Sequence, residues 1–258
     1  LNDGVENKLL DLRFLNRGKI ETRSDIATLD MDAKSLQEVG RWPWSREKHI
    51  PSILAAKEHQ MDALAFDIFF TERQERKLEY NEVETINDSI LTINEVKSLF
   101  PDPDIDLANA AADAKNIYFG YIFFPQPSNK MPVKKRTEVK DARLKILEEK
   151  KFFRKINPDD YETINDFYDI DPPVDELIES SKGTYFFQTV AEPDGISRRY
   201  PLVGKYEDRL FPNAGLALAL DHYNVSFEDV QIIPGKHLVI TLHSPDEHGR
   251  NSIKIHID

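Results

Sequence analysis

Residues 41–70, RWPWSREKHIPSILAAKEHQMDALAFDIFF, decide the fold of this chain. The segment begins with two tryptophans around Pro43 and continues with a helical spacing of apolar residues. It ends in the dense apolar run of residues 63–70, which only Asp67 interrupts. A helix that leads into a continuous apolar strand is the repeating unit of an α/β core. A carboxylate near the end of such a strand marks the sheet edge where ligands usually bind, so Asp67 is the first candidate site residue.

Further strands and helices are predicted on both sides of this unit. Apolar runs bounded by turn or helix signals predict strands at residues 25–31, 63–70, 116–124 and 184–190. Helical periodicity predicts helices at residues 1–20, 33–40, 46–60, 104–114, 174–181 and 212–223. Three short alternating strands follow at residues 230–234, 237–241 and 252–257.

Local signals fix several of the boundaries. Asp32 is a predicted N-cap for the helix that Gly40 ends, and Ser45 is a predicted N-cap for the helix of residues 46–60. The helix of residues 104–114 is predicted to be capped by Asp104 or Asp106.

Two charged stretches, residues 71–103 and 125–182, are predicted to be insertions. The first has a weak helical period, and the basic part of the second, residues 130–155, is predicted to be a solvated helix or loop. The order of the elements predicts an α/β fold over a single domain, residues 1–258. We expect three layers around a mixed, partly parallel sheet, with late antiparallel strands.

Composition excludes several classes of function. The 258 residues contain no cysteine, which excludes disulfides, thiolate catalysis and cysteine-ligated metals. The formal net charge of -12 repels nucleic acid, so no nucleic-acid partner is predicted. No run approaches the roughly 18 to 20 apolar residues that span a bilayer. The seven histidines have no metal-site spacing, and no metal or other cofactor is predicted.

Asp30 and Asp32 suggest one enzymatic hypothesis. Two carboxylates two residues apart at the end of a strand are the arrangement that Mg²⁺-dependent, aspartate-based phosphatases use. The residues that follow, Ala33 and Lys34, do not match that pattern. The structural alternative is that Asp32 caps the next helix while Asp30 is a buried hydrogen-bonding residue.

The tryptophan segment suggests a binding site instead. Arg46 and Asp67 are predicted to form a charge-assisted pair at the end of the sheet. Trp42 and Trp44 either wall a pocket there or pack in the core with their indole N–H groups bonded.

A second arginine candidate follows the predicted turn at residues 193–195. Arg198 and Arg199 suit an anion, or else have a structural role. On the strand that is predicted to follow the turn they would point to opposite faces, so one of them at most serves a given pocket.

The chain resembles the second type of CHASE domain, the cyclase- and histidine-kinase-associated sensory extracellular domains. The tryptophan-proline-tryptophan block and the aspartate-bearing strand carry the resemblance most specifically. The matching pieces are, in order, Ile26–Asp30, Ser35-Leu36, Gly40, Arg41–Arg46, Ala65–Phe70, Asp106–Ala111, Asn116, Pro193–Gly195, Arg198-Arg199, Pro201-Leu202 and Phe211–Leu216.

The resemblance implies a non-enzymatic, extracytoplasmic (periplasmic or extracellular) sensor of a transmembrane receptor. It implies membrane attachment through segments outside this chain, and a cyclase, histidine kinase or similar cytoplasmic module as output. The signal would be an unidentified small molecule or protein. A homodimer is expected, because such outputs usually act in pairs.

The resemblance carries no catalytic residues over to this chain, so the matched positions are candidates for a signal-binding pocket. Together with Trp44, these candidates are Asp30, Trp42, Arg46, Asp67 and Arg198. Two alternatives stay open: the phosphatase that would use Asp30 and Asp32, and an interaction module without a small ligand whose charged insertions face a protein partner.

Overall fold

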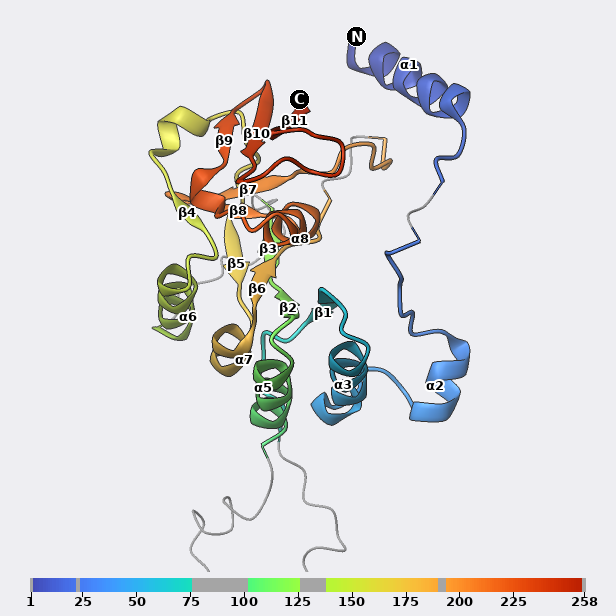
Figure 1. The fold of residues 1–258 in the computed structure, drawn as a ribbon, viewed down its shortest axis with the longest axis vertical. Coiled ribbons are helices and arrows are strands. Elements are labelled where there is room, and N and C mark those ends of the chain that lie inside the picture. Colours follow the sequence, from blue (N-terminus) through green and yellow to red (C-terminus); the bar gives the residue numbers. More distant parts are fainter. Residues whose placement is uncertain (1, 22–23, 76–101, 126–137, 190–193, 257–258) are drawn as a thin grey trace, which may run out of the picture. The chain divides into compact units, whose positions relative to one another are not determined.

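The computed structural model describes residues 2–21, 24–75, 102–125, 138–189 and 194–256 (Figure 1). The chain divides into two compact units, residues 1–44 and residues 45–258.

The first unit contains helices α1 (Asn2–Arg17) and α2 (Ala33–Val39). Asp32 caps α2 as predicted, with its Oδ1 accepting from the Ser35 backbone N–H at 2.8 Å, and Gly40 ends the helix at a φ of 110°. The strand predicted at residues 25–31 is wrong, because the described part of this segment is exposed and has no strand assignment. An apolar-polar alternation becomes a strand only when a neighbour accepts its hydrogen bonds, and no strand is described within residues 1–44.

The second unit is built on a parallel sheet that contains the strand of the opening segment. The predicted run at residues 116–124 divides at Tyr121, where the chain leaves this sheet, and the run at residues 184–190 gives only a short strand. The strands lie in the spatial order β1 (Leu64–Phe69), β2 (Ile117–Gly120), β6 (Gly183–Tyr185). The prediction of a partly parallel α/β fold is therefore confirmed.

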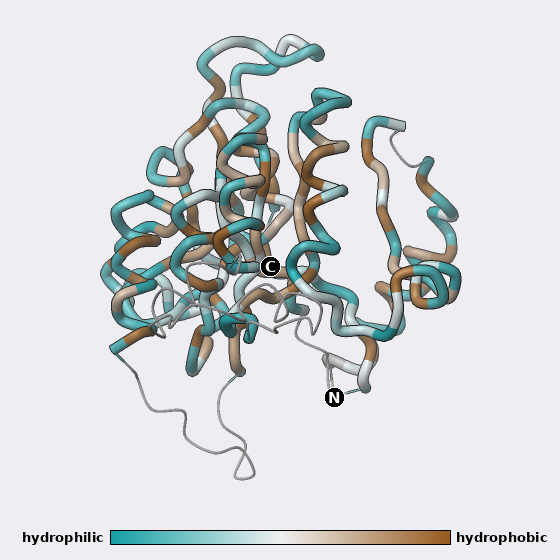
Figure 2. Tube along the Cα trace, turned by 90° about the horizontal axis from the view of Figure 1, so that it is seen from below, coloured by the Kyte–Doolittle hydropathy of each residue, from teal (hydrophilic) through white to brown (hydrophobic). Residues whose placement is uncertain are grey.

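Helices cover both faces of this sheet. On one face, apolar side chains of three helices pack with Phe66, Ile117 and Phe119, and the middle helix contacts the other two (Figure 1). On the other face a single helix packs over Tyr118 and Tyr185. The three helices are α3 (Ile50–Glu58), α5 (Pro103–Ala114) and α7 (Asp175–Ser180), and the single one is α8 (Ala214–His222). The helical turns in Figure 2 carry both teal and brown residues, as expected for helices with one buried face.

Two predicted helix starts need correction, and proline explains both. Ser45 precedes only a 3₁₀ turn, η1 (Arg46–Lys48), and α3 starts afresh because Pro51 has no N–H to continue a helix through this point. Asp102, and neither Asp104 nor Asp106, caps α5, because Pro103 occupies the first helical position. Asp104 is therefore released for the contacts described below.

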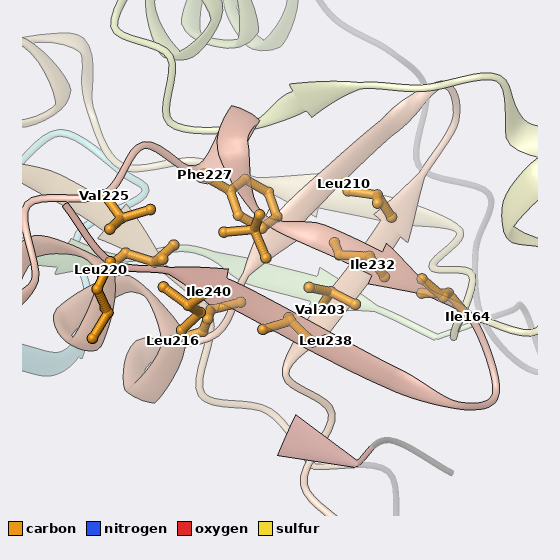
Figure 3. Packing of buried hydrophobic residues seen from close by; sticks show 12 residues of the cluster. Ile164, Val203, Leu210, Leu216, Leu220, Val225, Phe227, Ile232, Leu238 and Ile240 are labelled. Carbon is orange, nitrogen blue, oxygen red and sulfur yellow. The ribbon is translucent and has the colours of Figure 1, made fainter. Parts of the chain in front are cut away.

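The remaining elements contribute to two further clusters of buried side chains, one of which joins α8 to the late strands. Side chains of α8 and of the late strands point toward one another there, as Leu216, Leu220, Leu238 and Ile240 do in Figure 3. The three predicted late strands are confirmed as β9 (Gln231–Ile233), β10 (His237–Thr241) and β11 (Ser252–His256), in the order β11-β10-β9. The other elements are β3 (Ile122–Phe124), α6 (Glu138–Glu149), β4 (Arg154–Lys155), η3 (Pro158–Tyr161), β5 (Asp169–Asp171), β7 (Val203–Tyr206), β8 (Arg209–Pro212) and η4 (Phe227–Asp229).

Several predictions fall on these elements. The insertion predicted at residues 71–103 lies mostly in residues 76–101, outside the described residues. The described part of residues 125–182 contributes buried side chains, including Leu144, Leu147 and Phe153 of the segment predicted to be solvated. The strand expected directly after residues 193–195 is delayed until Val203, so Arg198 and Arg199 do not lie on a strand.

Candidate functional site

Arg46 organises the carboxyl end of β1 on the face covered by three helices. Its Nε donates to Asp104 Oδ1 at 2.7 Å, and its Nη2 donates to the carbonyl oxygen of Glu72 at 2.6 Å. The guanidinium also lies over the ring of Phe70, 4.6 Å from the ring centroid. One side chain thus ties together η1, the start of α5 and the segment that leaves β1.

Gln74 completes this arrangement. Its backbone N–H donates to Asp104 Oδ2 at 2.8 Å, and its side-chain Oε1 accepts from the backbone N–H of Arg46 at 2.6 Å. Both carboxylate oxygens of the fully buried Asp104 are therefore bonded. We refer to Arg46, Glu72, Gln74 and Asp104 as the Arg46 network. The predicted pair between Arg46 and Asp67 is wrong, because Asp104 takes this place.

His49 adjoins the Arg46 network and is 5% exposed. Its ring meets those of Phe66 and Phe70 edge-on, at centroid distances of 6.0 and 5.4 Å. Burial, and then the positive charge of Arg46, lower the pKa of His49 below its usual value.

A second polar group continues the same edge along α6. Arg143 donates from Nε to Asp175 Oδ1 at 2.8 Å and from Nη1 to the Thr71 carbonyl at 2.7 Å. Lys140 is buried and pairs with Asp169 at 2.5 Å and with Asp171 at 3.4 Å. Sequence analysis missed these residues because they stand in a strongly charged segment, where a solvated side chain is the normal expectation.

Asp67 lies apart from these networks, on the face that α8 covers. It falls where the pairing of β1 with β2 is irregular, because Phe66 pairs with Phe119 while Phe69 pairs with the next residue, Gly120. Its side chain is exposed and forms no hydrogen bond or ion pair with the described residues of 45–258. Its negative charge adds to burial in raising the pKa values of Tyr185 and Tyr200.

The tryptophans and Asp30 belong to the first unit. Trp44 donates from Nε1 to the Gly40 carbonyl at 2.7 Å, and its ring meets that of Trp42 edge-on at 5.9 Å. The indole N–H of Trp44 is therefore bonded, but Trp42 is 41% exposed and does not pack in a core as the structural alternative expected. Asp30 is exposed and does not follow a strand, so the strand end on which the phosphatase hypothesis depends is not formed.

Arg198 has a local partner. Its Nη2 pairs with Asp194 Oδ2 at 2.9 Å, and its side chain is only 4% exposed. The same arginine is the main reason why the pKa of the Asp194 carboxyl is lowered. Arg198 thus joins the two ends of the turn that Gly195 makes at a φ of 78°.

A hollow of about 370 Å³ lies beside the end of α8, and sequence analysis did not single it out. Buried Leu220 and Val225 contribute its apolar lining. Its polar lining consists of Asp221, Asn224, Ser226, Asp229 and His243. Asp221 already pairs with Lys182 at 2.6 Å, and no group of three or more possible metal ligands occurs among the described residues.

These observations define an α/β protein that has polar networks at the carboxyl edge of a parallel sheet. The CHASE2 domain family model matches residues 1–256, and the chain therefore belongs to the CHASE2 domain family. No curated protein and no solved structure matches the chain.

The family membership confirms the resemblance and gives the general role. CHASE2 domains are extracytoplasmic sensor domains and are not catalytic. No helix in the described part of the chain is long and apolar enough to cross a membrane.

Proposed function

We propose that this chain is the signal-sensing domain of a transmembrane receptor whose cytoplasmic output is a cyclase, a histidine kinase or a similar module. The CHASE2 match over residues 1–256 is the observation that carries this proposal. The domain would stand on the periplasmic or extracellular face of the cell membrane, attached through segments outside this chain.

We further propose that the signal binds at the carboxyl end of the β1-β2-β6 sheet, where ligands of parallel sheets usually bind. The Arg46 network supports this placement because it fixes the backbone that leaves β1, so a pocket edge there would be preorganised. The signal must favour one conformation of the domain over another, since a ligand with equal affinity for both shifts nothing. Receptor dimerisation would carry this shift to paired output modules.

The test uses the parent receptor in its native membrane. Protease is added to intact spheroplasts and to lysed ones, and fragments are detected with an antibody against this domain. We expect cleavage of the domain in intact spheroplasts, followed by a changed output activity in the washed membranes. Protection of the domain until lysis would place it in the cytoplasm and overturn the proposal.

Output coupling is tested in the same membranes. Deletion of residues 45–223 should leave an output module that is active but no longer responds to culture supernatant or other conditions that regulate the intact receptor. A response that survives the deletion would show that sensing occurs elsewhere in the receptor.

A further inference from the structure

The late hairpin brings two histidines together. His237 is the first residue of β10 and His256 is the last residue of β11, and the two are direct partners in the antiparallel pairing of these strands. Their ring centroids are 6.4 Å apart. The pair is hidden in the sequence, because the two positions are far apart along the chain and only strand pairing makes them neighbours.

The hydrogen-bond pattern of the hairpin places these two side chains at a close pair. The backbone N–H of Leu242 donates at 2.9 Å to the carbonyl oxygen of Asn251, which is its direct partner when the same register continues. Hydrogen-bonded and non-hydrogen-bonded pairs alternate along an antiparallel ladder. His237 and His256 lie an odd number of positions further along, so they form a non-hydrogen-bonded pair, in which opposite side chains are closest.

Both rings lie on the solvent side of the hairpin. Leu238 and Ile240 of β10 point into a buried cluster in Figure 3, and successive side chains of a strand point to opposite faces. His237 is therefore on the outer face, where it is half-buried, and His256 is exposed. Neither imidazole forms a hydrogen bond or ion pair with the described residues of 45–258. Their ring nitrogens are thus left for solvent or for a ligand.

Neighbouring positive charges favour the neutral form of His237. Desolvation, and then the charges of Lys254, His256 and Lys236, lower the pKa of this imidazole below its usual value. A neutral imidazole is the form that binds a metal ion. Lys254 stands two positions before His256 and shares the outer face, so its charge also repels any cation that binds there.

Two imidazoles at this separation suit a divalent transition metal ion. With metal–nitrogen bonds of about 2.0–2.1 Å, a tetrahedral ion would hold the two ring centroids roughly 5 Å apart, so the rings need to approach by roughly 1 Å. Imidazole nitrogen suits copper, zinc and nickel, whereas magnesium and calcium prefer oxygen ligands. The described residues offer no third metal ligand to this pair, so water would complete the coordination.

We propose that His237 and His256 form a binding site for a divalent transition metal ion such as Cu²⁺ or Zn²⁺. The ion would join the two strands of the hairpin through one nitrogen of each ring. The inference goes beyond the proposed function and does not depend on it, because it rests on the geometry of β10 and β11 alone.

The test is calorimetric titration of the untagged chain with Cu²⁺ and, separately, with Zn²⁺. We expect both ions to bind, and Cu²⁺ to bind more tightly, as it usually does at nitrogen ligands. His237→Gln and His256→Gln should each weaken binding at least about tenfold, because the ion loses its second attachment. His243→Gln is the matched control, since His243 is also exposed and closely follows β10, and it should leave the affinity unchanged.

Lys254 provides a second measurement with the opposite sign. Lys254→Gln removes a positive charge beside the site and should strengthen Cu²⁺ binding about threefold. Weaker binding by this variant would contradict a cation site. Failure of both ions to bind, or binding by His237→Gln and His256→Gln that equals that of His243→Gln, would overturn the inference. Circular dichroism of each variant confirms that it is folded.

Discussion

Asp104 and Asp67 lie at the same edge of the parallel sheet and have opposite surroundings. Asp104 is fully buried, and both of its oxygens are bonded within the Arg46 network. Asp67 is exposed, and its side chain forms no hydrogen bond or ion pair with the described residues of 45–258. A buried carboxylate needs a bonded partner because its desolvation costs free energy. An exposed carboxylate needs none because water solvates it. The difference separates a charge that holds the fold from a charge that is left to solvent.

Breaking the Arg46 network should have the largest effect. Arg46→Ala leaves the buried Asp104 carboxylate without its cation, and removal of one partner of a buried pair costs about 3–5 kcal/mol. We expect a fall of that size in the free energy of unfolding, measured by urea denaturation. Arg41→Ala, at an exposed arginine nearby in sequence, should change it by less than about 0.5 kcal/mol.

A double variant sharpens this prediction. Arg46→Ala combined with Asp104→Ala should destabilise by clearly less than the sum of the single variants, because the second change removes the uncompensated charge left by the first. Additive losses would mean that the two side chains contribute independently of each other.

The packing of the face that α8 covers is tested by two glycines. Gly183 faces the Tyr118 ring, where a Cβ would lie 2.6 Å from Tyr118 Cε1, so Gly183→Ala should cost about 1–3 kcal/mol through overpacking. Gly215→Ala in α8 meets nothing closer than 3.6 Å and should stabilise by up to about 1 kcal/mol through helix propensity. Thermal unfolding of both variants measures the difference. Equal changes in the thermal unfolding midpoint of the two variants would show that the Tyr118 ring moves aside at little cost in free energy.

These contrasts explain which parts of the structure the sequence could predict. Local signals sufficed for β1, for the Asp32 cap and for the late hairpin strands, since each depends on neighbours within a few residues. They failed for residues 25–31, where a strand pattern has no strand partner within its unit.

The candidate site was harder to predict because its contacts are long-range. Arg46 meets Asp104 across 58 residues, and the sequence offers Asp102, Asp104 and Asp106 as similar candidates. Lys140 is buried in a segment whose composition favours solvent exposure. The sequence placed Asp67 correctly near the carboxyl end of its strand. That its side chain has no ion-pair partner among the described residues of 45–258 could be seen only in the structure.

The histidine beside the Arg46 network should make stability depend on pH. The folded-state pKa of His49 is lowered, so the unfolded chain binds the proton more readily. Stability is therefore fully present above about pH 6.5, the ordinary value, and falls as the pH drops below it toward the lowered pKa. The slope from one histidine is at most about 1.4 kcal/mol per pH unit. His49→Phe should flatten urea-denaturation stability in this range, and an unchanged slope would assign the pH dependence to other groups.

Asp67→Asn should have the smallest effect on stability of all. An exposed carboxylate without a partner in its unit contributes little to folding, so we expect a change in the free energy of unfolding within about 0.5 kcal/mol. Urea denaturation beside Arg46→Ala gives the direct comparison, because both residues stand at the same sheet edge. A loss above about 1.5 kcal/mol would show that Asp67 bonds to a group of the chain itself, and the contrast with Asp104 would then disappear.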